Sequence, residues 1–160
     1  MWVNFDELPL QSRVWVFQSN RIMSPSEQSS IDAAVKQFVQ KWSTHGVQVL
    51  ASHVLYYNCF VVIAADEQKQ AVSGCSIDSF TALFKAFGTQ YNLSFFDRFS
   101  IAHKSGDGVV ISNLDDFKQL IGDGHITLDT IVFNNLIEQM HDLSTKWELP
   151  LKESWQKRYL

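Results

Sequence analysis

The chain has 160 residues, of which 46% are hydrophobic and 13% aromatic, and its formal net charge is −4. This length fits one compact domain that buries about 70% of its unfolded surface. The acidic balance argues against a nucleic-acid-binding protein, which would show a basic face or stripe. No window approaches 18 consecutive apolar residues and the first residues are mixed and acidic, so we expect neither a secreted nor a membrane-bound protein.

The only cysteines are Cys59 and Cys75, and they lack CxxC spacing. Two cysteines are too few for a disulfide scaffold. We therefore expect a cytoplasmic protein in a reducing compartment.

The first elements carry clear local signals. Residues 13–18 are rich in β-branched and aromatic side chains and predict a strand. Ser24, Pro25 and Glu27 form the signature of a capped helix start, and Gly46 is expected to end that helix. Apolar side chains recur at helical spacing between these points: Ile31, Val35, Phe38, Val39 and Trp42.

Two strands and a second helix are predicted next. The β-prone runs are residues 47–57 and 60–65, with a turn at Asn58, and the second run is apolar on both faces, as in a central strand. A polar loop follows over residues 66–72, and an amphipathic helix then runs from Ser73 to about residue 88.

The last third of the chain predicts shorter elements. Residues 95–103 favour a strand, 105–108 a hairpin turn, and 109–111 its partner strand, after which Asn113 caps a short helix. Apolar side chains at helical spacing then predict a final helix that ends at Pro150 and leaves a tail over 151–160; they are Phe133, Leu136, Ile137, Met140, Leu143 and Trp147.

The first six elements run strand, helix, strand, strand, helix, strand. This order is typical of a ferredoxin-like βαββαβ core, and right-handed crossovers would place both long helices on one face of an antiparallel sheet. We therefore expect a single α+β domain over residues 1–160, with a C-terminal β-α-α extension.

Motifs for nucleotides and metals are missing. The chain has neither the Gly-x-x-x-x-Gly-Lys-Ser/Thr phosphate loop nor GxGxxG, which argues against a conventional ATPase or a Rossmann enzyme. Its five histidines form no HxxxH pair or Cys–His cluster, so we expect surface histidines, no metal site and no cofactor.

The strongest candidate site is the helix start at residues 73–78. Free N–H groups and the helix dipole could bind an anion there, with Ser73, Gly74, Ser76 and Asp78 as binding residues. The same field would favour a Cys75 thiolate as a nucleophile. The structural alternative is a serine cap, a tight turn at Gly74 and a small buried cysteine.

Arg13, Arg21 and Arg98 each border a predicted strand end, and Arg21 and Arg98 are further binding candidates. Arg21 follows the first strand, and Arg98 follows Asp97, so that the guanidinium could either pair locally or bind an anion. The tail over 154–159 mixes cations with aromatic rings and could dock on a partner, whereas Trp155 packing back onto the domain is the ordinary alternative.

Several segments resemble a family of small uncharacterised bacterial proteins that are often labelled "ABC transporter ATPase". They cover most of the chain: residues 12–21, 38–46, 73–78, 97–98, 132–136 and 154–158. The resemblance implies a small cytosolic protein. The residues do not support the ATPase label, because the phosphate loop and the Leu-Ser-Gly-Gly-Gln signature are both missing.

The leading hypothesis is therefore a non-catalytic binding or interaction module. Its partner would be a small anion or another protein, not nucleic acid or a membrane, and sheet faces could pair in a homodimer. The competing hypothesis is a small enzyme that uses Cys75 or an oxyanion pocket at the same helix start. An arginine or histidine within reach of Cys75 would favour the enzyme.

Overall fold

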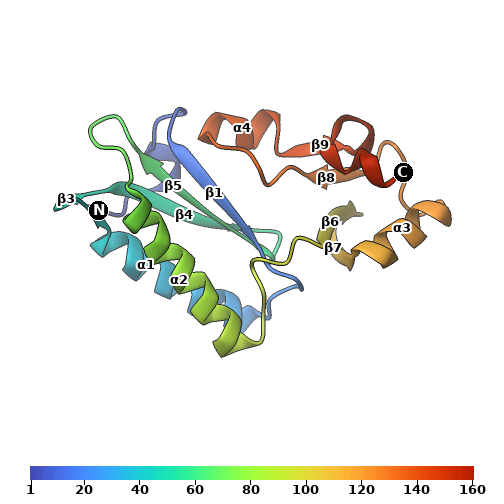
Figure 1. Ribbon diagram of the computed structural model, residues 1–160, viewed down its shortest axis with the longest axis horizontal. Helices are drawn as coiled ribbons and strands as arrows, with labels where there is room; N and C mark the ends of the chain where they lie inside the picture. Colours follow the sequence, from blue (N-terminus) through green and yellow to red (C-terminus); the bar gives the residue numbers. More distant parts are fainter.

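The computed structural model describes residues 1–160 as a mixed α+β fold with antiparallel sheets and four α-helices (Figure 1), which confirms the expected class. The helices are α1 (Pro25–Lys41), α2 (Gly74–Tyr91), α3 (Leu114–Gly122) and α4 (Met140–Thr145). Three short 3-10 helices are η1 (Phe5–Glu7), η2 (Leu151–Glu153) and η3 (Trp155–Tyr159). The strands are β1 (Arg13–Gln18), β2 (Ser43–Thr44), β3 (Val47–Gln48), β4 (Leu50–Tyr56), β5 (Phe60–Asp66), β6 (Ser100–Ser105), β7 (Gly108–Asn113), β8 (Ile131–Phe133) and β9 (Glu148–Pro150).

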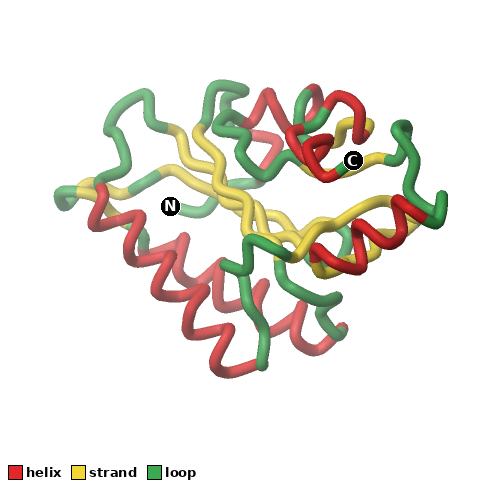
Figure 2. The backbone as a smooth tube through the Cα atoms, turned by 45° about the vertical axis from the view of Figure 1, so that its right-hand side comes forward, coloured by secondary structure: helices red, strands yellow, loops and turns green.

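The first sheet has the strand order β1-β5-β4, and β5 is its central strand as expected. Helices α1 and α2 lie together on one face of this sheet, as Figures 1 and 2 both show. The core between helices and sheet is largely aromatic: the rings of Phe17 and Phe84 stack with centroids 3.9 Å apart, and Phe80 packs edge-on against Phe17. The other face of the sheet packs against residues from the C-terminal part, Phe133 and Trp147 among them.

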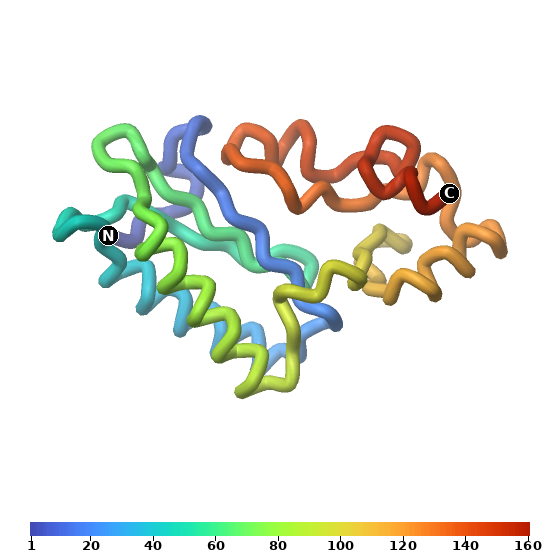
Figure 3. The backbone as a smooth tube through the Cα atoms, in the orientation of Figure 1, coloured from blue at the N-terminus to red at the C-terminus, as the bar shows by residue number.

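The second sheet has the order β7-β6-β8-β9. The strand predicted at 95–103 was expected to complete the first sheet, but the structure places β6 at 100–105 in the second sheet, and residues 95–99 form a loop. The first three predicted strands form the first sheet, and no fourth strand joins it. Chain tracing in Figure 3 shows the N-terminus beside the first sheet and the C-terminus beside the second, at opposite ends of the molecule.

The predicted start of α1 is confirmed and its predicted end is wrong. Ser24 Oγ accepts from the Glu27 N–H (3.2 Å), and Glu27 Oε1 accepts from the Ser24 N–H (2.8 Å), which completes a capping box. The helix ends at Lys41 because Trp42 leaves it to bury its indole in the core. Gly46 instead lies in the turn between β2 and β3, at a φ of 76°.

Helix α2 ends close to its predicted end, with Gly88 in its last turn. It runs through Gly88 to Tyr91, and Asn92 closes it in the left-handed conformation (φ 52°). A Cβ on Gly88 would lie 2.8 Å from the carbonyl oxygen of Leu93. Glycine is therefore required here by the close return of the chain, not because it ends the helix.

The predicted final helix through Phe133 and Trp147 is wrong. The segment forms β8, the short helix α4 and β9, and Pro150 lies in β9 rather than at a helix end. Three of the predicted inward residues, Phe133, Ile137 and Trp147, are indeed buried in one cluster. Antiparallel pairing of β8 with β9 brings Phe133 close to Trp147, so the helical spacing of these side chains does not reflect a helix. The expected β-α-α extension is thus replaced by a four-stranded sheet with two short helices.

Candidate functional site

A pocket of about 770 Å³ lies where the first sheet meets the second. We call it the junction pocket. Its walls come from β1, the segment 95–102 that leads into β6, residues 133–136 after β8, and η3. Its volume falls in the range of pockets that hold small organic ligands.

The interior and the mouth of the junction pocket are both largely apolar. Strand residues supply the inner wall, with Val16 from β1, Ile101 from β6 and Phe133 from β8. The structure has eleven large hydrophobic side chains exposed at its surface, and four of them line this pocket: Phe96, Phe99, Leu136 and Trp155. Scattered exposed apolar side chains are ordinary, but a cluster around a concave site is typical of a binding surface.

Two arginines line the pocket, Arg98 from the loop before β6 and Arg158 from η3. Of the four arginines in the chain, Arg13 and Arg21 pair with carboxylates, whereas neither pocket arginine has such a partner. The Arg158 guanidinium lies over the rings of Trp155 and Tyr159 at 5.0 and 5.1 Å, so stacking orients it.

The loop that carries Arg98 is held by its own aspartate. The carboxylate of Asp97 accepts from the Phe99 N–H (2.9 Å) and from the Ser100 hydroxyl (2.8 Å). Both carboxylate oxygens of Asp97 therefore accept hydrogen bonds from its own loop, and the ion pair considered for Asp97 and Arg98 does not form. The tight turn leaves Arg98 and Phe99 exposed at the pocket.

A chain of side-chain hydrogen bonds fixes the pocket where the sheets meet. Trp147 Nε1 donates to Asn135 Oδ1 (3.0 Å), and Asn135 Nδ2 donates to Gln18 Oε1 (3.0 Å). Gln18 Nε2 then donates to the carbonyl oxygen of Ser100 (3.0 Å). Gln18 therefore ties β1 to both β6 and the segment after β8, and both its amide nitrogen and its amide oxygen have partners.

Gln156 differs from these amides because its side-chain oxygen has no hydrogen-bond partner. Its side chain lines the pocket, is 4% exposed and donates from Nε2 to the carbonyl oxygen of Phe133 (2.8 Å). Its Oε1 is buried and accepts no hydrogen bond. An unpartnered buried acceptor costs free energy, and a donor group that reaches it would recover that cost.

The helix start at Ser73 is confirmed as a capped start whose hydroxyls have structural partners. Ser73 Oγ accepts from the Ser76 N–H (3.2 Å), and the buried Ser76 hydroxyl donates to the carbonyl oxygen of Ser43 (2.9 Å). Cys75 and Asp78 are exposed, and no ion pair joins Asp78 to a cation. A Cβ on Gly74 would meet open space.

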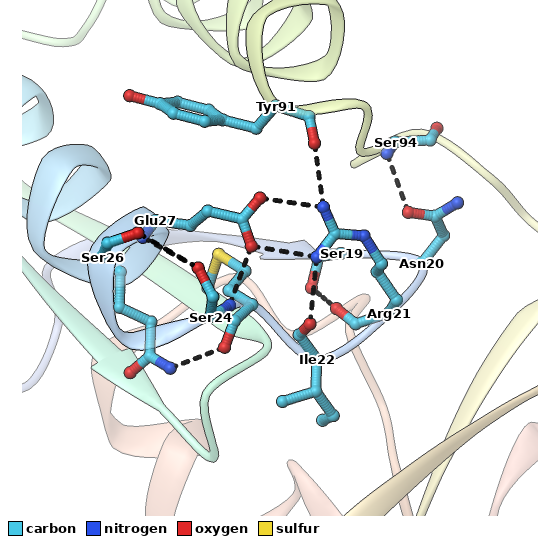
Figure 4. A network of polar contacts seen from close by, with 11 residues as sticks. Ser19, Asn20, Arg21, Ile22, Ser24, Ser26, Glu27, Tyr91 and Ser94 are labelled. Carbon is cyan, nitrogen blue, oxygen red and sulfur yellow. Dashed lines mark hydrogen bonds and ion pairs between the residues drawn. The ribbon is translucent and has the colours of Figure 1, made fainter.

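Arg21 lies beside Tyr91, at the C-terminal end of α2 (Figure 4), whereas Ser73 caps the other end of this helix. Its guanidinium binds both carboxylate oxygens of Glu27 (2.9 and 2.8 Å) and donates to the carbonyl oxygen of Tyr91, the last residue of the helix (2.8 Å). An 18-residue helix is about 27 Å long, so Arg21 and the Ser73 helix start form no common site. Arg98 belongs to the junction pocket, so the structure does not bring the candidates together.

The expectation of surface histidines fails for His53 and His103, which are each 7% exposed. His53 Nδ1 accepts from the indole N–H of Trp2 (3.1 Å), while its Nε2 lies 2.8 Å from Asp32 Oδ1. Burial lowers the pKa of His103. No group of three or more histidine, cysteine, aspartate or glutamate side chains is arranged to hold a metal ion.

Sequence reasoning singled out Arg98 and the aromatic tail separately and missed Gln18, Asn135 and Gln156. Amides carry no local signal of a binding role, because the same residue types are common on any polar surface.

Cys59, which was not a candidate, is completely buried, and burial raises its pKa to about 12.

None of the helices is both long and apolar enough to cross a membrane. A comparison of the chain with protein-family models, curated proteins and solved structures finds no match.

Proposed function

We propose that this protein is a non-catalytic binding module whose ligand occupies the junction pocket. The ligand would combine an anionic group with an apolar or aromatic body. The observation that carries this proposal is the coincidence, at one pocket, of the two arginines without carboxylate partners and four of the exposed large hydrophobic side chains.

Charge supports an anionic ligand. Among the lining residues two arginines and one aspartate carry formal charge, so the lining has a net charge of +1 in a chain whose net charge is −4. Guanidinium groups bind carboxylates and phosphates with charge-assisted hydrogen bonds. The carboxylate of Asp97 is turned toward its own loop, which leaves Arg98 to face a ligand.

The side-chain chemistry of the pocket supports binding rather than catalysis. No cysteine, histidine, lysine or glutamate lines it, so it offers no thiol nucleophile and no imidazole base. Its one carboxylate, that of Asp97, accepts two hydrogen bonds from its own loop. Cys75 lies at the start of α2, and neither candidate arginine is at that end of the helix. The enzyme hypothesis therefore gains no support from the arrangement around Cys75.

The fold proposal follows from the same pocket. In a ferredoxin-like unit the last strand of βαββαβ pairs with the first. We infer that the first sheet with α1 and α2 is such a unit, in which the position beside β1 is left partly open and forms one wall of the pocket. Both cysteines are free, which supports the proposal of a cytoplasmic binding protein.

Isothermal titration calorimetry with a matched pair of ligands tests the proposal. We expect 3-phenylpropionate to bind the unmodified protein, and 3-phenylpropionamide, which lacks the charge, to bind about tenfold more weakly or worse. Arg98→Gln should weaken binding of the carboxylate by a similar factor. Arg13→Gln makes the same charge change at a residue that does not line the pocket and that already pairs with Glu67, so it should leave the affinity unchanged. Equal binding of carboxylate and amide, or an unchanged affinity in Arg98→Gln, would overturn the proposal.

A further inference from the structure

The outer edge of β1 is open over a short stretch beside the junction pocket. On a strand, each residue directs its N–H and C=O to one side, and successive residues alternate. The Val14 N–H donates outward to Glu138 O (2.9 Å), and the Asn20 N–H donates to Ser94 O (2.9 Å), whereas Ser19 N–H donates toward the β5 side, to Cys59 O. By this alternation Val16 and Gln18 also face outward.

No backbone hydrogen bond reaches the outer side of β1 between these two ends. The sheet pairs β1 with β5 alone, and the segment around Gln139 covers only the beginning of β1, where Met140 N–H donates to Ser12 O (2.8 Å). Val16 and Gln18 both line the junction pocket. The backbone N–H and C=O groups of these two residues are therefore unpaired within the chain, at the wall of a pocket large enough for a ligand.

We propose that the ligand of this pocket is the carboxyl-terminal segment of a partner polypeptide, which adds to β1 as a short extra strand. This inference rests on the proposed function and names its ligand class. Strand addition to an open sheet edge is an established mode of peptide recognition, and arginines suit the terminal carboxylate.

The unpaired stretch of the β1 edge is covered at both of its ends, which favours the end of a partner chain over a strand that continues past the pocket. Glu138 and Ser94 cover the sheet edge at Val14 and Asn20, and the six-residue spacing between these two positions corresponds to roughly 20 Å of extended chain. A partner strand that continued beyond both ends of this stretch would collide with both covering segments. A strand that terminates inside the pocket has to enter from one side only. Arg98 and Ser94 belong to the same loop between α2 and β6, so the carboxylate would lie at the Gln18 end of the gap.

The side chains around the gap fit a peptide. Phe99, Leu136 and Trp155 present exposed apolar surface to side chains of an inserted strand. A small carboxylate would use the arginines but would leave the backbone of Val16 unpaired, so the two ligand sources are distinguishable.

The test uses an acetylated pentapeptide of alternating threonine and valine that ends in phenylalanine with a free carboxylate. Calorimetry compares it with its C-terminal amide and with two peptides that are N-methylated on alternate backbone nitrogens, one for each parity. Only every second N–H of a bound strand points toward β1, so N-methylation of the other set of nitrogens serves as the control. We expect the amide to lose about tenfold in affinity or more, and one N-methylated peptide to lose clearly more than the other.

Hydrogen exchange of individual amides gives the second measurement. Bound peptide should slow exchange at Val16 and Gln18 at least about tenfold, because their N–H groups gain acceptors, whereas 3-phenylpropionate should not. Equal loss for both N-methylated peptides, or unchanged exchange at Val16 and Gln18 under saturating peptide, would overturn the strand-addition inference. In that case a carboxylate that still depends on Arg98 would leave the proposed function standing. If neither the peptide nor 3-phenylpropionate depends on Arg98, the proposed function itself fails.

Discussion

The two sheets of this protein are built in different ways. The first sheet has strands of six or seven residues and is covered by α1 and α2, of 17 and 18 residues, whereas the second contains two strands of only three residues and is accompanied by α3 and α4, of nine and six. The first has an extensive aromatic core, and the second has a small cluster around Phe117. The regular part provides a rigid wall at β1, and the irregular part provides the loops that complete the pocket. This contrast places the candidate site at their junction.

The largest effect is expected in the core of the first sheet. Phe84 is completely buried and contacts the rings of Phe17, Phe87 and Phe95. Phe84→Ala should lower the free energy of unfolding by about 3–5 kcal/mol, because it removes apolar contacts and leaves a cavity. Urea denaturation measures the change, and Leu128→Ala, at an exposed side chain, is the control. A loss below about 1 kcal/mol for Phe84→Ala would contradict a tightly packed core.

A smaller effect is expected where the two sheets are joined. Gln18→Ala removes the side chain that links Ser100 and Asn135. It should cost about 1–3 kcal/mol, because two polar groups lose their partner in a partly buried setting. The exposed Gln119, whose side chain makes no hydrogen bond, provides the control Gln119→Ala. Matching unfolding curves for the two variants would show that the sheets are held together without this link.

The smallest effect is a pH dependence at the start of α1. The Arg21 guanidinium and the Ser24 N–H hold the pKa of Glu27 down at about 2. A carboxyl with a lowered folded-state pKa contributes stability that is fully present above its unfolded value near 4.5 and is lost as the pH falls toward 2. The stability difference between the unmodified protein and Glu27→Gln should therefore shrink as the pH falls from about 5 to 2. A difference that stays constant over this range would rule out the ion pair as its source.

The regular part of the fold was predictable because its signals are local. Ser24, Pro25 and Glu27 specify a helix start within four residues, and the unbroken apolar run at 60–65 predicts a central strand on its own. The end of α1 was not predictable, because it is set by tertiary burial of Trp42. Helix-like spacing between residues 133 and 147 was misleading because antiparallel pairing buried the same side chains.

The candidate site was predictable only in fragments. Arg98 and the tail near Trp155 were both noticed for their chemistry, but nothing local indicates that they meet. They meet because β6 belongs to the second sheet and not to the first, and the order of elements along the chain did not indicate this. The helix start at Ser73 carried a stronger local signal, yet its hydroxyls are used for capping and for binding Ser43.

The most direct test of the central claim is to locate the binding surface by NMR. We would titrate the ¹⁵N-labelled protein with 3-phenylpropionate and follow backbone and side-chain amide shifts. The expected result is a set of saturable shifts at Phe99, Arg158 and the side-chain amide of Gln156, with none at residues 73–78. Saturable shifts confined to residues 73–78, or no shifts at the junction pocket at millimolar ligand, would contradict the account.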